Sequence, residues 1–227
     1  MLEDNLKRVR ENIINACVTS GRAEDSVELV GVTKTVSSEL ISRSIDLGIG
    51  HVGENRVQEF LAKYDMFEEK KVKKSIIGHL QRNKVKYIID KVDLIQSLDS
   101  ERLAEEISLR AKSIGKTVDC LAEINIGGEE SKSGVSPERA QEFIEKAAEY
   151  ENIRIKGIMA IPPIMTDVKT QIKYFEQLYK LFIDIKGKKS DNISMDILSM
   201  GMSSDYVEAI KCGANMVRVG TAIYGRR

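Results

Sequence analysis

One lysine of this chain ends a short apolar segment, and its position suggests amine chemistry. Residues 27–37 read VELVGVTKTVS, and Lys34 follows Val30 and Val32 at the two-residue spacing that puts strand side chains on one face. A lysine at the buried end of a strand is driven toward the neutral amine, which attacks carbonyl groups to form a Schiff base. A lysine that extends its ammonium group to water fits these residues equally well.

A second segment, LSMGMSSDYVEAIKCGANMVRVGTAIYGRR, has the residues of an anion-binding site. Gly201 permits close backbone approach to a ligand, and Ser203 and Ser204 stand at the start of a predicted helix, whose free N–H groups attract anions. Gly220 and Thr221 follow the last predicted strand. Because the loops after strands seven and eight of a barrel commonly bind phosphate, we predict that these two loops converge on a phosphate group. An ordinary helix N-cap would also explain the serines.

Other polar residues stand in or at the ends of predicted strands. Alternation puts Arg218 on the strand face opposite two valines, where a guanidinium group needs an acceptor such as Glu123 or a ligand atom. Asn55 and His79 follow the second and third strands and could line the same opening, although such residues more often cap a helix or bond the backbone. The glycine pattern at 48–53 runs from a helix into a strand, which is the reverse of a dinucleotide-binding fingerprint.

Periodicity predicts the elements that position these residues. Apolar residues at helical spacing predict a helix over 2–19, and eight strand-like segments then alternate with helices. Eight such units in about 200 residues favour a single closed (β/α)8 barrel, a TIM barrel with an extra N-terminal helix, over an open doubly wound sheet. The whole chain, 1–227, is expected to form one domain. The first predicted strand ends near Lys34. The other seven cover 49–54, 75–79, 93–96, 121–126, 155–161, 195–200 and 214–220.

Composition argues against several classes of protein. Lys plus Arg and Asp plus Glu both number 35, so no overall field would collect nucleic acid. The three cysteines are scattered, with no C-x-x-C pair and no histidine cluster, and predict neither a disulfide nor a metal site. The charged N-terminus has no apolar signal segment, and no apolar run is long enough to cross a bilayer. We therefore expect a cytoplasmic protein that binds neither nucleic acid nor membrane.

Several motifs occur in an order that one family shares. They are VGVTK, HVGENRVQEF, IGHLQRNK, INIGGEESKSG, GIMAIPP, LSMGMSSDYVEAI and VRVGTAIYG. Together they span nearly the whole chain and resemble the pyridoxal phosphate homeostasis proteins of the YggS/PROSC type. The resemblance implies a barrel similar to the N-terminal domain of alanine racemase, with pyridoxal 5'-phosphate (PLP) as the cofactor.

The resemblance also implies roles for individual residues. PLP would form a Schiff base with Lys34, and its phosphate would rest on the serine pair and on the loop after the last strand. Arg218 would contact either the pyridine nitrogen or the phosphate. The full expected cofactor-binding set is Lys34, Asn55, His79, Met200, Ser203, Ser204, Arg218, Gly220 and Thr221.

The favoured function is a PLP-binding protein, without catalysis of its own, that acts in vitamin B6 homeostasis and amino-acid balance. Its expected unit is a monomer, with a dimer as the alternative, and its expected protein partners are apo PLP-dependent enzymes. A PLP-dependent amino-acid racemase is the alternative, and it needs a second proton donor opposite the lysine. Tyr224 is the candidate, although a tyrosine near barrel closure more often packs. A Schiff-base aldolase acting on a phosphorylated sugar would need the same lysine and phosphate site.

Overall fold

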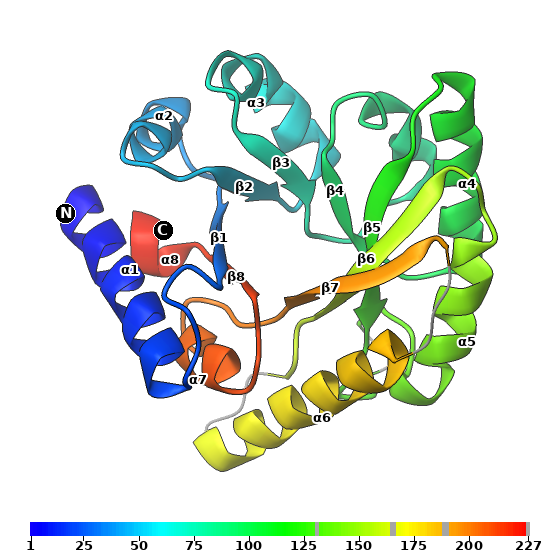
Figure 1. Cartoon of the computed structure of the whole chain (residues 1–227). Helices are drawn as coiled ribbons and strands as arrows, with labels where there is room; N and C mark the ends of the chain where they lie inside the picture. The colour runs from blue at the N-terminus through cyan, green and yellow to red at the C-terminus, as the bar shows by residue number, and fades with distance from the viewer. Residues whose placement is uncertain (130–131, 164–166, 188–190, 226–227) are drawn as a thin grey trace.

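Eight parallel strands close into a barrel in which each strand lies beside the next along the chain and β8 pairs with β1 (Figure 1). The computed structural model describes residues 1–129, 132–163, 167–187 and 191–225. The predicted (β/α)8 barrel with an N-terminal helix is confirmed. Its strands are β1 (Glu28–Val32), β2 (His51–Glu54), β3 (Lys73–Ile76), β4 (Leu94–Leu98), β5 (Val118–Ile124), β6 (Ile153–Ala160), β7 (Ile193–Ser199) and β8 (Met216–Val219).

Helices surround the barrel, and most begin where the sequence supplies a suitable cap. The Asp167 side chain accepts hydrogen bonds from the backbone N–H groups of Lys169 and Thr170, which starts α6. Pro137 occupies the first position of α5, where its missing N–H is no loss. The helices are α1 (Leu2–Thr19), α2 (Ser38–Asp46), α3 (Val57–Glu69), α4 (Glu101–Ser113), α5 (Pro137–Ala148), α6 (Val168–Lys186), α7 (Tyr206–Lys211) and α8 (Thr221–Tyr224).

Two connections differ from the prediction. Where the alternation of strands and helices predicts an α-helix between the third and fourth strands, the chain forms a short 3-10 helix, η1 (Arg82–Tyr87). The four-residue helix α8 after β8 was not expected, because so short a segment carries no periodic signal. By contrast, α1 has the bounds that periodicity predicted. Within the described ranges, no helix is both long and apolar enough to cross a membrane.

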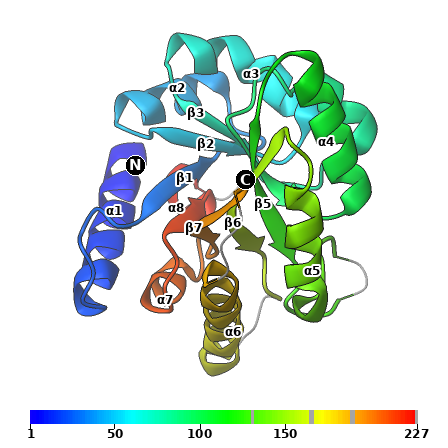
Figure 2. The same ribbon diagram turned by 45° about the vertical axis from the view of Figure 1, so that its right-hand side comes forward.

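Helix α1 packs outside the barrel across the seam where β8 meets β1 (Figure 2). Asn5 donates a hydrogen bond from Nδ2 to the carbonyl oxygen of Ile223 in α8, at 3.1 Å. Asn12 donates from Nδ2 to the Tyr206 hydroxyl of α7, at 2.9 Å. The helix therefore ties down two short helices that flank the last strand.

The apolar core has two parts. The larger part fills the space between the strands and the surrounding helices. The smaller part lies inside the barrel and consists of Val30, Leu94, Leu121, Met159 and Met216. The interior also holds buried polar side chains, which must find hydrogen-bond partners there. These are His51, Ser75, Gln96, Ser199 and Arg218.

Candidate functional site

A cavity of about 490 Å³ opens where β1 and β8 end. Catalytic and binding sites of such barrels lie at this end, and the volume is typical of small-molecule sites. Six of the nine residues expected from the sequence contribute to its lining. The lining residues are Val32, Lys34, Met202, Ser203, Ser204, Arg218, Gly220, Thr221 and Ala222.

Lys34 lies in a turn, two residues after β1 ends at Val32. Its side chain is exposed at the cavity lining. The prediction that Lys34 is buried at the end of the strand is wrong, because β1 ends at Val32 and Lys34 lies in the exposed turn that follows. Its predicted place at the barrel mouth agrees with the lining, where Lys34 lies with Val32 and Arg218. The amine is instead accessible to a ligand that enters the cavity from solvent.

The loop before α7 meets the loop after β8 through one hydroxyl group. Ser203 Oγ accepts hydrogen bonds from the backbone N–H groups of Gly220, at 3.0 Å, and Ala222, at 3.2 Å. Two donors therefore converge on one oxygen atom beside the cavity. The six-residue helix α7 begins at Tyr206, two residues later than Ser204, so the serines lie in the turn before the helix rather than at its first residues, and Ser204 is exposed.

Gly201 serves the packing of this loop rather than close approach to a ligand. Its φ is +95°, and an added Cβ would lie 2.7 Å from the Cβ of Ala209 in α7. Its carbonyl oxygen accepts a hydrogen bond from the Arg218 backbone N–H at 3.0 Å. Asp205 accepts from the Met202 N–H at 2.6 Å, which closes the turn that carries the serines.

Arg218 is buried in the barrel interior, with 3% of its surface exposed. Its Nη1 donates to Ser199 Oγ at 2.6 Å and its Nη2 donates to the Ala160 carbonyl oxygen at 2.8 Å. Burial lowers the pKa of Arg218 to about 10, against the opposing charges of Glu123 and Asp205. Within the described residues Arg218 forms no ion pair, so the alternative of a direct contact with Glu123 is not observed and the acceptors are neutral.

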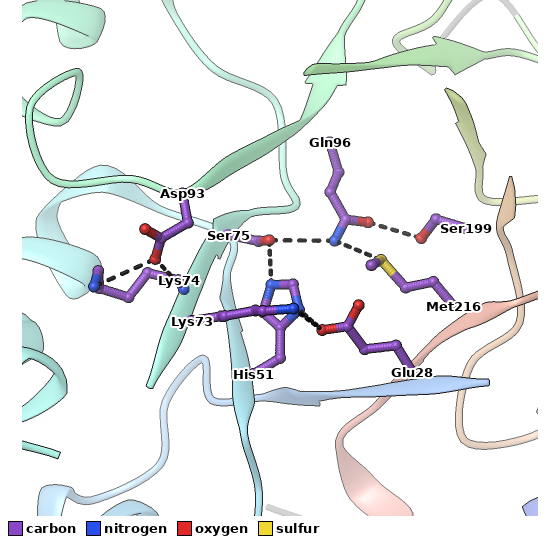
Figure 3. Close-up of polar contacts among 9 residues, drawn as sticks. All are labelled: Glu28, His51, Lys73, Lys74, Ser75, Asp93, Gln96, Ser199 and Met216. Carbon is purple, nitrogen blue, oxygen red and sulfur yellow. Dashed lines mark hydrogen bonds and ion pairs between the residues drawn. The ribbon is translucent and has the colours of Figure 1, made fainter. Parts of the chain in front are cut away.

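A chain of polar contacts continues from Ser199 through the barrel (Figure 3). Ser199 Oγ donates to Gln96 Oε1 at 2.7 Å. Gln96 Nε2 donates to Ser75 Oγ at 3.4 Å and contacts Met216 Sδ at 3.3 Å. Ser75 Oγ lies 2.6 Å from His51 Nε2. Each buried hydroxyl or amide group in this series of contacts, from Ser199 to Ser75, therefore has a hydrogen-bond partner.

This series of polar contacts ends at the opposite mouth of the barrel, where β1, β2 and β3 begin. His51 Nδ1 lies 2.9 Å from Glu28 Oε1, and Lys73 Nζ lies 3.2 Å from the same oxygen (Figure 3). The hydrogen bond from His51, with help from Lys73, lowers the pKa of Glu28 to about 2 despite partial burial. Glu28 is therefore a carboxylate over the whole physiological range.

Glu123 in β5 is half-buried and has fewer hydrogen-bond partners than Glu28. Its Oε2 atom is buried and has no hydrogen-bond partner among the described residues. Burial, together with repulsion from Asp99, raises the pKa of Glu123 to about 7, while Arg218 and His79 oppose the shift. The group can therefore change its charge near neutral pH.

The three remaining expected residues do not line the cavity. His79 is exposed, and its Nδ1 lies 2.9 Å from Asp99 Oδ2. Asn55 is half-buried at the end of β2. Met200 is fully buried, and its backbone N–H donates to the carbonyl oxygen of Met216. Asn55 and His79 follow β2 and β3, whereas the cavity lies where β1 and β8 end.

Tyr224 also lies away from the cavity lining. Its hydroxyl is 3.0 Å from Ser44 Oγ of α2, and an added Cβ at Gly31 would lie 3.1 Å from it. Gly31 points outward from the barrel, since Val30 and Val32 point inward. The tyrosine therefore packs between the barrel wall and α2.

Comparison with known proteins places the chain in a family. The alanine racemase N-terminal domain family matches residues 5–227. The pyridoxal phosphate homeostasis protein of Aquifex aeolicus (strain VF5) is 42% identical over 224 residues, which are 99% of this chain and 97% of that protein. The protein of the same name from Pasteurella multocida (strain Pm70) is 36% identical over 228 residues, which are 100% of this chain and 97% of that protein. The chain belongs to the pyridoxal phosphate homeostasis protein family.

A solved structure of this family shares the fold. PipY of Synechococcus elongatus PCC7942, solved with PLP bound, superposes with a TM-score of 0.85 at 26% identity, covering 99% of this chain and 100% of PipY. The family predicted from the motifs is confirmed. Sequence reasoning missed Val32, Met202 and Ala222 as lining residues. Val32 carried a signal, its place on the inward strand face, whereas Ala222 contributes a backbone N–H that no residue type reveals.

The half-buried Glu123 carboxyl group predicts a specific dependence of the protein's stability on pH. The pKa of Glu123 is about 7 in the folded protein, against an ordinary glutamate value of 4.5 in the unfolded chain. Folding therefore favours the protonated form, and the stability of the fold falls as pH rises between these values. The free energy of unfolding of Glu123→Gln should match that of the unmodified protein near pH 4 and exceed it by up to about 3 kcal/mol near pH 8. Urea unfolding at both pH values measures this, and an equal difference at both would contradict the assigned shift.

Proposed function

We propose that this chain binds PLP and acts in PLP homeostasis, with Lys34 as the residue that holds the cofactor covalently. The observation that carries the proposal is one cavity that brings together an exposed amine and two converging backbone donors. These groups match the aldehyde and the phosphate of a single ligand. When bound, PLP supplies an aldehyde that condenses with a lysine amine, losing one water as the C=N bond forms.

The phosphate site in this proposal is made of loops rather than a helix end. The N–H groups of Gly220 and Ala222 already converge on one oxygen, Ser203 Oγ, and several hydrogen-bond donors on one oxyanion form an anion site. The exposed hydroxyl groups of Ser204 and Thr221 on the same lining add donors. The donor set therefore fits a phosphate group.

Arg218 supplies a fixed positive charge to the cavity. With a pKa of about 10 it is charged at neutral pH, and its contacts with Ser199 and Ala160 fix its orientation. Contact with either the pyridine nitrogen or the phosphate fits this position. A guanidinium group only donates hydrogen bonds, so a pyridine nitrogen that contacts it must act as the acceptor and carry no proton. The pyridine ring would then withdraw electrons less strongly.

We infer a holding role rather than catalysis, with the whole chain, 1–227, acting as one PLP-binding domain. Racemisation needs a proton donor on the face opposite the lysine. Tyr224, the candidate from the sequence, has its hydroxyl beside Ser44 and outside the cavity lining, which supports the holding role. In this proposal the protein acts as a monomer. It releases PLP to apo PLP-dependent enzymes, because a C=N bond to lysine is reversible.

The covalent role of Lys34 is tested by substitution. Lys34→Ala should abolish the visible absorbance band of the protein with PLP and the adduct that borohydride traps, because the amine is gone. Lys34→Arg is the matched control for charge, and it should also lose the adduct. Peptide mapping by mass spectrometry locates the reduced adduct. An adduct on another lysine of the unmodified protein would refute the assignment.

The phosphate site is tested by comparing two ligands. Replacing both Ser203 and Ser204 by alanine should weaken PLP binding by about tenfold and pyridoxal binding by much less, since pyridoxal lacks the phosphate. Titrations followed by absorbance give both dissociation constants. Equal losses for the two ligands would place the phosphate elsewhere.

The holding role is tested by hydrogen exchange at the amino-acid Cα. Incubation of the PLP-loaded protein with each L-amino acid in deuterated water should give no sustained exchange and no loss of optical purity, as followed by NMR and chiral analysis. Lys34→Ala serves as the blank. Sustained racemisation that Lys34→Ala abolishes would make this protein an enzyme and end the proposal that it only holds PLP.

A further inference from the structure

We propose that Lys63, a lysine buried beside the turn that carries Lys34, is a positioning residue that holds the Lys34 amine in the geometry needed to meet its carbonyl partner. The inference rests on the proposed covalent role of Lys34. Lys63 does not line the cavity. It acts on the turn, through hydrogen bonds and charge, from α3.

The Lys63 ammonium group joins three elements. Nζ donates to the Thr33 carbonyl oxygen at 2.8 Å and to Glu54 Oε1 at 2.6 Å, and it lies 3.8 Å from Glu59 Oε2. Only 9% of the Lys63 side chain is exposed, and the Glu54 side chain is fully buried. One cation therefore connects the end of β1, the end of β2 and the first turn of α3, in a place where water competes little.

The residues on both sides of Lys34 are held by this cluster. Thr33 donates from Oγ1 to Glu54 Oε1 at 2.6 Å, and the Val36 N–H closes the turn on the Thr33 carbonyl oxygen at 3.1 Å. Thr35 has a φ of +56° and donates its backbone N–H to Glu59 Oε2 at 2.7 Å. A β-branched residue rarely adopts a left-handed conformation, so surrounding contacts must hold it there.

The charges of the cluster explain why the cation matters. Burial raises the pKa of Glu54, and the hydrogen bonds from Lys63 and Thr33 oppose that shift. Without Lys63, Glu54 and Glu59 would lose their shared counterion, and the Thr33 carbonyl would lose a charged donor. The turn would then relax, and the Lys34 amine would spend less time in the reactive position. The Ser203–Gly220 contact involves none of these residues.

The chain offers a matched control in Lys74. Its side chain is also 9% exposed, and it also bridges two carboxylates, Glu68 at 2.6 Å and Asp93 at 3.3 Å. Figure 3 shows Lys74 beside Asp93. Lys74 is the second residue of β3 and Asp93 precedes β4, so both lie at the end of the barrel where the strands begin, opposite the cavity. Both partner carboxylates are about half exposed, so Lys74→Met removes a lysine buried to the same extent, with more exposed partners, and leaves the Lys34 turn untouched.

The experiment measures how fast PLP labels Lys34. The amine nitrogen adds to the aldehyde carbon, water leaves, and hydride from borohydride reduces the C=N bond to a stable secondary amine that mass spectrometry assigns to a peptide. Lys63→Met should slow labelling of Lys34 by roughly tenfold, and Lys74→Met should leave the rate unchanged. The concentration of inorganic phosphate that halves the labelling rate should be the same in all variants. Lys63→Arg should restore most of the rate.

These variants distinguish positioning of the Lys34 amine from a general loss of stability. Unchanged labelling in Lys63→Met, or equal slowing in Lys74→Met, would overturn the positioning role. If Lys63→Met does not fold, Glu59→Ala, which removes the acceptor for the Thr35 N–H at a partly exposed site, should still slow labelling several-fold; no change would overturn the inference. Failure of the proposed function looks different, because the unmodified protein would then carry no adduct on Lys34.

Discussion

The burial of the Arg218 guanidinium group inside the barrel is the interaction on which the site depends. Removing such a group from water is costly unless its donors are satisfied, and here they meet a hydroxyl and a carbonyl oxygen rather than a paired carboxylate. The resulting pKa of about 10 still leaves the group charged at neutral pH. The barrel interior must therefore provide a polar layer where a purely structural barrel would pack branched apolar side chains.

The polar layer has a consistent direction. Arg218 donates to Ser199, so the Ser199 proton goes to Gln96 Oε1 and fixes the orientation of that amide. Gln96 Nε2 then donates to Ser75 Oγ, which leaves the Ser75 proton for His51 Nε2. This assigns the histidine proton to Nδ1, facing the Glu28 carboxylate.

Every hydrogen bond in this series is therefore donated in the same direction, from the Arg218 cation toward the Glu28 anion at the opposite mouth. Hydrogen bonds aligned in this way strengthen one another. Each also fixes the rotamer of the next side chain, so the orientation of Arg218 is supported across the full depth of the barrel. The polar contacts far from the cavity therefore help to fix the orientation of Arg218 at the cavity.

The sequence predicted the barrel because strand and helix periodicities alternate clearly, and it predicted the inward face of Arg218 because alternation holds along β8. It placed Lys34 at the barrel mouth but wrongly expected the side chain to be buried, because a turn with a left-handed threonine follows β1. It included Asn55 and His79 because every strand end was treated alike, whereas the cavity occupies only the β1–β8 side. The roles of Glu54 and Lys63 depend on contacts between elements that spacing along the chain does not encode.

The location of the cavity follows from closure of the barrel. Lys34 and Arg218 are far apart in sequence, yet Val30 and Arg218 are register partners where β1 pairs with β8. Only this last pairing brings the amine next to the loops around Ser203 and Gly220. The short helices α7 and α8 flank the seam, and α1 holds both through Asn12 and Asn5. The first helix of the chain thus stabilises the seam at which the two halves of the site meet.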